Sequence, residues 1–434
     1  MKLKYFWFAL AIIIINCFVA TAQIPTVSKE AEERTEKEPP TAHRPGAGFV
    51  LVDNAKGKLV FSAMASIRYL NNTALEDSFT NDAGRTSAID KRNDLQFQKV
   101  MLYFKGWLFT PKLRYLTYVW TSNTSQGQSA QVVVGGNLQY ELNSHIDVGA
   151  GIGGLPTNRS MGGQWPLWNR QDARPMADEY FRGSFTTGIW AQGKIVDGFY
   201  YKTMLGNNLS QLGIDAGQLD DGFDTWSTTL VWTTNNFSPL GSYTDFENHE
   251  KLATVLGGSY SRSNETRQSQ PGAEDPENSQ IRISDGTGIF SFNAFAPNTQ
   301  IQEAQYQMTS LFGGIKYKGF ALDVDYFMRW VSKFKTTGTI PVSELFDQGF
   351  SIQASSMLID KKLSLYGIGS YIKGEYGNPW EINFGLNWFP FKTRAFRLNP
   401  EFIYTDRSPV GYLSYPTVVG AKGAVFMVNI ELFY

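Results

Sequence analysis

The feature that most constrains this chain is a period-two alternation of apolar and polar residues, which continues from Phe49 to Tyr434. In one clear segment, Leu322 and Val324 alternate with Asp323 and Asp325. Side chains on a β-strand point alternately to its two faces, so the pattern predicts strands with one apolar and one polar face. The aromatic content (31 Phe, 21 Tyr and 11 Trp) supports β structure, because these residues are enriched in strands.

The length and polar face of these segments indicate a membrane barrel. The segments run for about 9–13 residues, which is long enough to cross a bilayer at a tilt. Their polar face mixes Asp, Glu, Lys, Asn and Gly, which suits a water-filled lumen, and aromatics such as Trp107 and Trp388 gather near segment ends. A bilayer admits only helices and closed barrels, and no long apolar helix follows the first residues. We therefore predict an all-β protein, a transmembrane antiparallel β-barrel of about 16 strands over residues 49–434.

The N-terminal residues carry an export signal. Lys2 and Lys4 precede an apolar run, and Ala20-Thr21-Ala22 is a cleavage pattern, so residues 1–22 are predicted to be a cleaved signal peptide. Cleavage removes Cys17, the single cysteine, and with it any disulfide chemistry. Lipidation of Cys17 is an alternative, although Asn16 stands where a small residue is wanted. Residues 23–48 are rich in Glu, Lys and Pro and predict a disordered periplasmic lead-in.

The connections between the predicted strands alternate between tight and long. Tight connections carry turn residues, as at Asp197-Gly198 and Lys318-Gly319, whereas long ones include 154–182 and 262–303. Short periplasmic turns and long outer loops are the expected asymmetry of an outer-membrane barrel. Two places fit poorly. The connection 235–249 is longer than a periplasmic turn should be, and residues 281–295 have the composition of a further strand, so the strand count is open by two.

The last strand has a pattern of its own. Phe426, Val428, Ile430 and Leu432 alternate with Met427, Asn429 and Glu431, and the chain stops on the aromatic Tyr434. An amphipathic final strand with a terminal aromatic resembles the signal that outer-membrane barrels present to the barrel assembly machinery. That machinery and outer-membrane lipids are therefore expected partners, and the expected location is the bacterial outer membrane.

Several short segments resemble the porin O/P type family of phosphate- and polyphosphate-selective outer-membrane porins. They are Arg68-Tyr69-Leu70, the segment Gly106-Trp107-Leu108-Phe109-Thr110-Pro111-Lys112-Leu113, and Gly188-Ile189-Trp190 leading to Gly206-Asn207. The resemblance covers most of the mature chain as a strand pattern with scattered short matches. It implies a sixteen-stranded, homotrimeric channel with a constricting third outer loop. It also implies selectivity for anions such as phosphate from a line of arginines and lysines.

The sequence offers two groups of cations for an ion path. By strand parity, Arg68, Lys99 and Lys105 face the lumen, but similar numbers of acids share that face, so a mixed-charge lumen with pairs across it is the simpler interpretation. The third long loop, residues 154–182, concentrates arginines and tryptophans. If it folds inward, its guanidinium groups offer paired donors to phosphate or carboxylate; otherwise it is a surface loop anchored by Trp165 and Trp168. The loop arginines in question are Arg159, Arg170 and Arg174.

Other chemistry has little support in the sequence. The formal net charge of -1 argues against nucleic-acid binding. The three histidines, His43, His145 and His249, are spaced too far apart to act together as metal ligands, and neither an enzyme nor a cofactor is predicted. The acidic cluster in 215–224 lacks regular calcium-ligand spacing, so a solvated turn is favoured over a calcium site.

These observations predict an outer-membrane porin, a passive diffusion channel for small hydrophilic solutes, with anions preferred. Two alternatives stay open: a barrel that serves as a surface adhesin or anchor, and a gated transporter for hydrophobic substrates. A barrel enzyme with His145 beside Ser144 is a third and weaker alternative.

Overall fold

The computed structural model describes residues 46–122, 131–162, 167–171, 173–209, 222–238, 242–267, 281–411 and 415–434. The predicted signal peptide (1–22), the predicted lead-in as far as residue 45, Trp165, and residues 215–221 of the acidic cluster lie outside the described residues.

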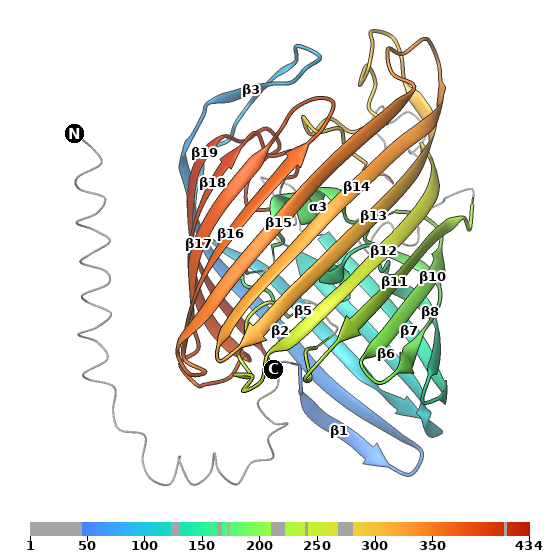
Figure 1. Cartoon of the computed structure of the whole chain (residues 1–434), viewed down its shortest axis with the longest axis vertical. Coiled ribbons are helices and arrows are strands. Elements are labelled where there is room, and N and C mark those ends of the chain that lie inside the picture. The colour runs from blue at the N-terminus through green and yellow to red at the C-terminus, as the bar shows by residue number, and fades with distance from the viewer. Residues whose placement is uncertain are drawn as a thin grey trace, which may run out of the picture. The chain divides into compact units, whose positions relative to one another are not determined.

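Sixteen antiparallel strands form a closed ring, which confirms the predicted fold class (Figure 1). Each strand pairs with its neighbours in the sequence order, and the last strand pairs with the first. The ring consists of β2 (Gly57–Leu75), β5 (Asn93–Leu108), β6 (Thr110–Ser122), β7 (Gln131–Asn143), β8 (Ile146–Gly154), β9 (Phe185–Val196), β10 (Phe199–Gly206), β11 (Thr225–Thr233), β12 (Ala253–Thr266), β13 (Ile301–Tyr317), β14 (Phe320–Thr336), β15 (Glu344–Ile359), β16 (Leu363–Lys373), β17 (Trp380–Trp388), β18 (Phe396–Asp406) and β19 (Gly423–Phe433).

Pairing between β19 and β2 closes the ring. The register runs from Gly423 opposite Leu75 to Phe433 opposite Met64, and the terminal Tyr434 exchanges both backbone hydrogen bonds with Ala63. Closure leaves no open edge in the ring, so every strand finds hydrogen-bond partners on both sides. A sheet needs this arrangement in a medium without water.

The alternation in the sequence corresponds to the two faces of the wall. On β14, Val324 and Tyr326 point outward and are 42% and 37% exposed, whereas Asp323 is fully buried inside. The outward side chains are apolar, as contact with acyl chains requires. The lumen differs from the expected water-filled space, because inward residues such as Phe327 and Val331 are apolar and buried. Loops packed inside the barrel cover them.

The tight connections join neighbouring strands at one end of the ring. At the turn between β13 and β14, Lys318 and Gly319 both have positive φ, at 48° and 82°. Two consecutive residues of that kind form the turn whose twist matches an antiparallel hairpin. Gly198, in the turn between β9 and β10, also has positive φ, at 81°.

Three further short strands are not part of the ring. Strand β1 (Phe49–Asn54) pairs only with the start of β2, and β3 (Ser78–Thr80) pairs with β4 (Thr86–Ala88). Residues 281–295 form no strand and contain one isolated bridge, between Arg282 and Gly288, so the ring has sixteen strands rather than eighteen. In the part of the chain described, no helix has both the length and the apolar character needed to cross a membrane.

Substitutions on β9 should separate the two faces. Ile189 points outward and is 51% exposed, so Ile189→Arg should cost about 2–4 kcal/mol of folding free energy near the bilayer midplane. The matched variant is Gln192→Arg, whose side chain faces the lumen on the same strand beside Asp147, and it should fold normally. Urea titration of the barrel in lipid vesicles measures both. Equal stability of the two variants would contradict the assignment of faces.

Candidate functional site in the barrel lumen

The described residues of the connection between β8 and β9 fold into the barrel, and we call these residues (155–162, 167–171 and 173–184) the inward loop. It contains a short 3-10 helix, η2 (Arg159–Gly162), and one α-helix, α3 (Met176–Phe181). Helix α3 lies against β14, β15, β16 and β17 (Figure 1). Every residue of α3 is buried, and the ring of Phe181 stacks on Phe327 of β14 with centroids 5.4 Å apart. Apolar packing on the inner wall therefore holds the loop inside.

Side chains of the barrel wall accept hydrogen bonds from the first backbone N–H groups of α3. The helix follows Pro175 and has no side-chain cap from its own sequence. Instead, the backbone N–H of Met176 donates to Glu381 on β17, and that of Ala177 donates to Ser370 Oγ on β16 at 2.8 Å. The first N–H groups of a helix lack partners within the helix, so these contacts fix its position on the wall.

Arg159 joins the inward loop to β14. Its Nη1 forms an ion pair with Asp323 Oδ1, and both side chains are fully buried. Its Nη2 donates to the carbonyl of Ser242 at 2.9 Å, and its guanidinium lies 4.6 Å from the ring centroid of Tyr243. Strand parity predicted that Asp323 faces the lumen, but its partner comes from a loop 164 residues away.

Arg170 joins the loop to β17 and β18. Its Nε lies 2.6 Å from Glu401 Oε1, and its Nη1 lies 3.4 Å from Glu381 Oε2. The guanidinium also lies 5.4 Å from the ring centroid of Tyr415. One buried cation thus serves two buried carboxylates, which a guanidinium with five donors is suited to do.

Arg174 pairs within the loop itself. Its Nη1 lies 3.5 Å from Glu179 Oε2, and its guanidinium lies 4.3 Å from the ring centroid of Trp168. The same glutamate binds Arg182 through both oxygens, at 2.7 and 2.6 Å. Burial raises the pKa of the neighbouring Asp178 above its usual value, and the charge of Arg174 opposes this shift.

The structure brings all three predicted loop arginines into ion pairs. A buried pair usually contributes little net stability, but loss of one partner is costly because the other charge remains buried. Arg159 and Arg170 therefore anchor the loop to the wall, and Arg174 pairs within the loop. Direct action of the arginines on a permeating solute stays a prediction.

The predicted wall cations make different contacts. Arg68 on β2 donates to Asn429 Oδ1 at 2.9 Å and to Gln171 of the inward loop at 3.4 Å. Lys99 on β5 lies 4.9 Å from the ring centroid of Trp120. Lys105, on the same strand, donates to the Gly46 carbonyl.

A second segment enters the lumen from the opposite end, and we call residues 242–249 the lumen insertion. It belongs to the connection between β11 and β12, at the end of the tight turns, and Ser242 to Asp245 are all buried. The backbone N–H of Tyr243 donates to the Leu167 carbonyl at 3.1 Å, and Thr244 Oγ1 donates to Asn169 Oδ1 at 2.6 Å. The insertion and the inward loop therefore meet inside the barrel.

Sequence reasoning missed this segment, although a signal was present. The connection was too long for a tight turn, and it contains three aromatic residues that a solvated turn does not need. Tyr243 packs with Trp168, Tyr103 and Phe433 in a buried lumen cluster. The excess length is explained by the path into the lumen and back.

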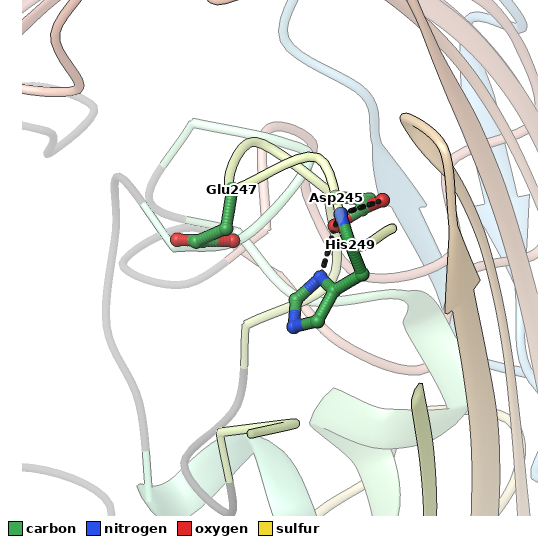
Figure 2. Close-up of side chains that lie close together, drawn as sticks. All are labelled: Asp245, Glu247 and His249. Carbon is green, nitrogen blue, oxygen red and sulfur yellow. Dashed lines mark hydrogen bonds and ion pairs between the residues drawn. The ribbon is translucent and has the colours of Figure 1, made fainter. Parts of the chain in front are cut away.

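Asp245, Glu247 and His249 of the lumen insertion are the one group of potential metal ligands within the described residues (Figure 2). Their ligand atoms lie within 4.8 Å of one another. Both carboxylates already have partners: Asp245 accepts from Gly319 N–H at 2.8 Å and contacts His249 Nδ1 at 2.5 Å, and Glu247 pairs with Arg394 at 2.7 Å. The arginine supplies the positive charge that a metal would bring, so the group is an internal salt-bridge network.

Comparison with known proteins identifies the fold. No protein-family model matches the sequence, and no curated protein matches it. Among solved structures, the outer-membrane expressed OmpT of Vibrio cholerae is similar, with a TM-score of 0.54 and 11% identity over 89% of this chain and 100% of that one. The outer membrane channel DcaP of Acinetobacter baumannii matches with a TM-score of 0.51 and 9% identity, over 89% and 99% of the two chains.

An anion-selective porin from Comamonas acidovorans is a third similar structure, with a TM-score of 0.51 and 11% identity over 87% of this chain and 100% of that one. With TM-scores above 0.5 and identities of 9–11%, these similarities establish a shared architecture and nothing finer. The chain has the closed barrel fold of bacterial outer-membrane porins and channels.

The pair Arg159–Asp323 can be tested by a double-mutant cycle. Arg159→Met leaves Asp323 buried without a counter-charge and should cost about 3–5 kcal/mol of stability, whereas Arg159→Met combined with Asp323→Leu should cost clearly less. Urea unfolding of the four proteins measures the coupling. Additive losses would mean that the two charges do not depend on each other.

Proposed function

We propose that this protein is an outer-membrane porin through which small hydrophilic solutes diffuse passively. The observation that carries the proposal is the inward loop, which buried ion pairs hold against the inner wall. A loop anchored in this way narrows a passage, whereas an adhesin would present its long loops outside. Transport of this kind requires no catalysis: charged and polar groups of the wall lower the cost of moving a hydrated solute across the membrane.

The outer membrane is the proposed location. The apolar outer face and the closed ring support it, and so does the fold shared with outer-membrane proteins. We further propose export by a cleaved signal peptide of residues 1–22 and insertion by the barrel assembly machinery, which would recognise the terminal strand. That strand, β19, closes the barrel against β2, so correct insertion and ring closure depend on the same residues.

A preference for anions such as phosphate is the finer part of the proposal. It agrees with the resemblance to porin O/P type proteins, and one structure of similar fold is described as an anion-selective porin. In this chain, carboxylates offset the charges of Arg159 and Arg170, whereas the ammonium group of Lys105 donates to the Gly46 backbone carbonyl. Lys105 is therefore better placed than these loop arginines to act on an anion.

We also propose a homotrimer. One form of the similar Vibrio cholerae protein is described as a trimer. In this chain, the outer surface of β6–β11 carries an apolar groove of about 610 Å³, lined by residues such as Leu138, Val148 and Ile189.

A gated transporter for hydrophobic substrates is the second candidate. The buried lumen cluster of Met64, Tyr103, Trp168, Tyr243 and Phe433 favours it, because an apolar surface inside a barrel suits an apolar solute. A pore that passes ions without added substrate argues against this candidate.

Planar-bilayer recording tests the proposed channel. The parent should give ohmic conductance steps, and replacement of Arg159, Arg170 and Arg174 together by Ala should shift the reversal potential in a KCl gradient toward cations. The reason is that Asp323 and Glu401 lose their counter-charges, whereas Glu179 keeps its pair with Arg182. Shortening the inward loop should raise single-channel conductance. A parent that never opens would rule out a passive pore.

A further inference from the structure

Two cations lie under the lumen insertion at the end of the barrel that carries the tight turns. Lys316 is near the end of β13, and Arg394 lies in the connection that leads into β18. Both are buried, with 1% and 7% of their surface exposed. One lies on a strand and the other in a connection, and both contact the lumen insertion at the Thr244 carbonyl.

Lys316 binds neutral oxygens of the insertion. Its Nζ donates to the Thr244 carbonyl at 3.0 Å and to Ser242 Oγ at 3.2 Å, and it lies 4.8 Å from the ring centroid of Phe237. Within the described residues, no ion pair of Lys316 is present. Its charge is thus solvated by the insertion rather than cancelled by a carboxylate.

Arg394 binds the same carbonyl and a carboxylate. Its Nη2 donates to the Thr244 carbonyl at 3.1 Å, and its Nη1 lies 2.7 Å from Glu247 Oε1. Burial disfavours the charged form of Glu247, but the charges of Arg394 and Lys316 outweigh it and hold the pKa of that carboxyl below its usual value. Glu247 is therefore ionised at neutral pH.

The lumen insertion offers Lys316 and Arg394 the same kind of oxygen acceptors that an anionic solute would offer. One carboxylate and one carbonyl oxygen occupy donors of Lys316 and Arg394, and charge-assisted contacts of this kind bind phosphate and carboxylate equally well. The side chain of Glu247 is 51% exposed, so solutes can reach it from solvent. Figure 2 shows hydrogen bonds between Asp245 and His249 and none from this pair to Glu247, so Glu247 can leave Arg394 without breaking the pair.

The other contacts of the insertion do not depend on Glu247. Asp245 accepts from the Gly319 N–H of the tight turn, and the ring of Phe246 packs against Phe389 with centroids 5.1 Å apart. These contacts tie the segment to the turns around it. A change at Glu247 should therefore alter the cation pair without releasing the insertion.

We propose that Lys316 and Arg394 form an anion-binding site at this mouth of the pore, and that Glu247 occupies it as a built-in competitor. The site takes oxyanions such as inorganic phosphate, which displace the Glu247 carboxylate from Arg394. The proposal rests on the proposed channel function and adds to it the residues that bind the anion.

The test measures block of chloride conductance by inorganic phosphate. Glu247→Gln removes the competing charge and should lower the half-blocking phosphate concentration by about tenfold, the effect of one charge-assisted contact. Lys316→Gln and Arg394→Gln should raise that concentration by a similar factor, and Arg394→Lys, which keeps the charge, should retain part of the block. The matched control is Lys194→Gln. Lys194 lies on β9 and pairs with Asp197 of the following tight turn, and phosphate should block the conductance of this variant at the same concentration as in the parent.

Two outcomes overturn the site. If the half-blocking phosphate concentration is the same in the parent, Glu247→Gln and Lys316→Gln, the anion binds elsewhere. The same conclusion follows if Lys194→Gln changes that concentration as much as Lys316→Gln does. Calorimetric titration of the detergent-folded protein with phosphate separates this site from the channel itself. Binding that follows the same order of variants in a barrel that conducts no ions would retain the site and reject only the proposed transport.

Discussion

Inside a bilayer there is no water to pair with peptide N–H and C=O groups, and this constraint determines the rest of the structure. A sheet meets it only by closing, which the pairing of β19 with β2 achieves. Closure then requires an apolar outer face and leaves an enclosed lumen where charged residues are tolerated. The inward loop, the lumen insertion and the charges that bind them all depend on that enclosed space.

Inside the lumen, charge is placed in pairs across long sequence separations. Arg159 meets Asp323, and Arg170 meets Glu401, so the inward loop is held by contacts that would each be costly to break singly. Around these pairs, α3 buries its apolar side chains on the inner wall. The result is a lumen filled by packed segments rather than an open water-filled tube, and the lumen insertion contacts the inward loop from the other end.

Much of the architecture could be predicted because it is local in the sequence. Strand alternation, tight turns such as Lys318–Gly319 and the terminal strand each depend on a few adjacent residues, and together they predicted a barrel of about 16 strands. The inward course of residues 154–182 was also suggested by their arginines and tryptophans. The paths of segments 235–249 and 281–295 could not be predicted, for one physical reason. Both segments belong to connections, whose paths depend on tertiary packing.

The sequence by itself determined which residues face lipid and which face the lumen, because strand parity assigns each side chain to one face. Only the tertiary structure decided which lumen charges meet. Asp323 could be assigned to the lumen, but not to Arg159, and Arg394 could not be connected with Glu247, since 147 residues separate them. Ring closure and loop packing set these distances, and Coulomb interaction depends on distance in space rather than along the chain.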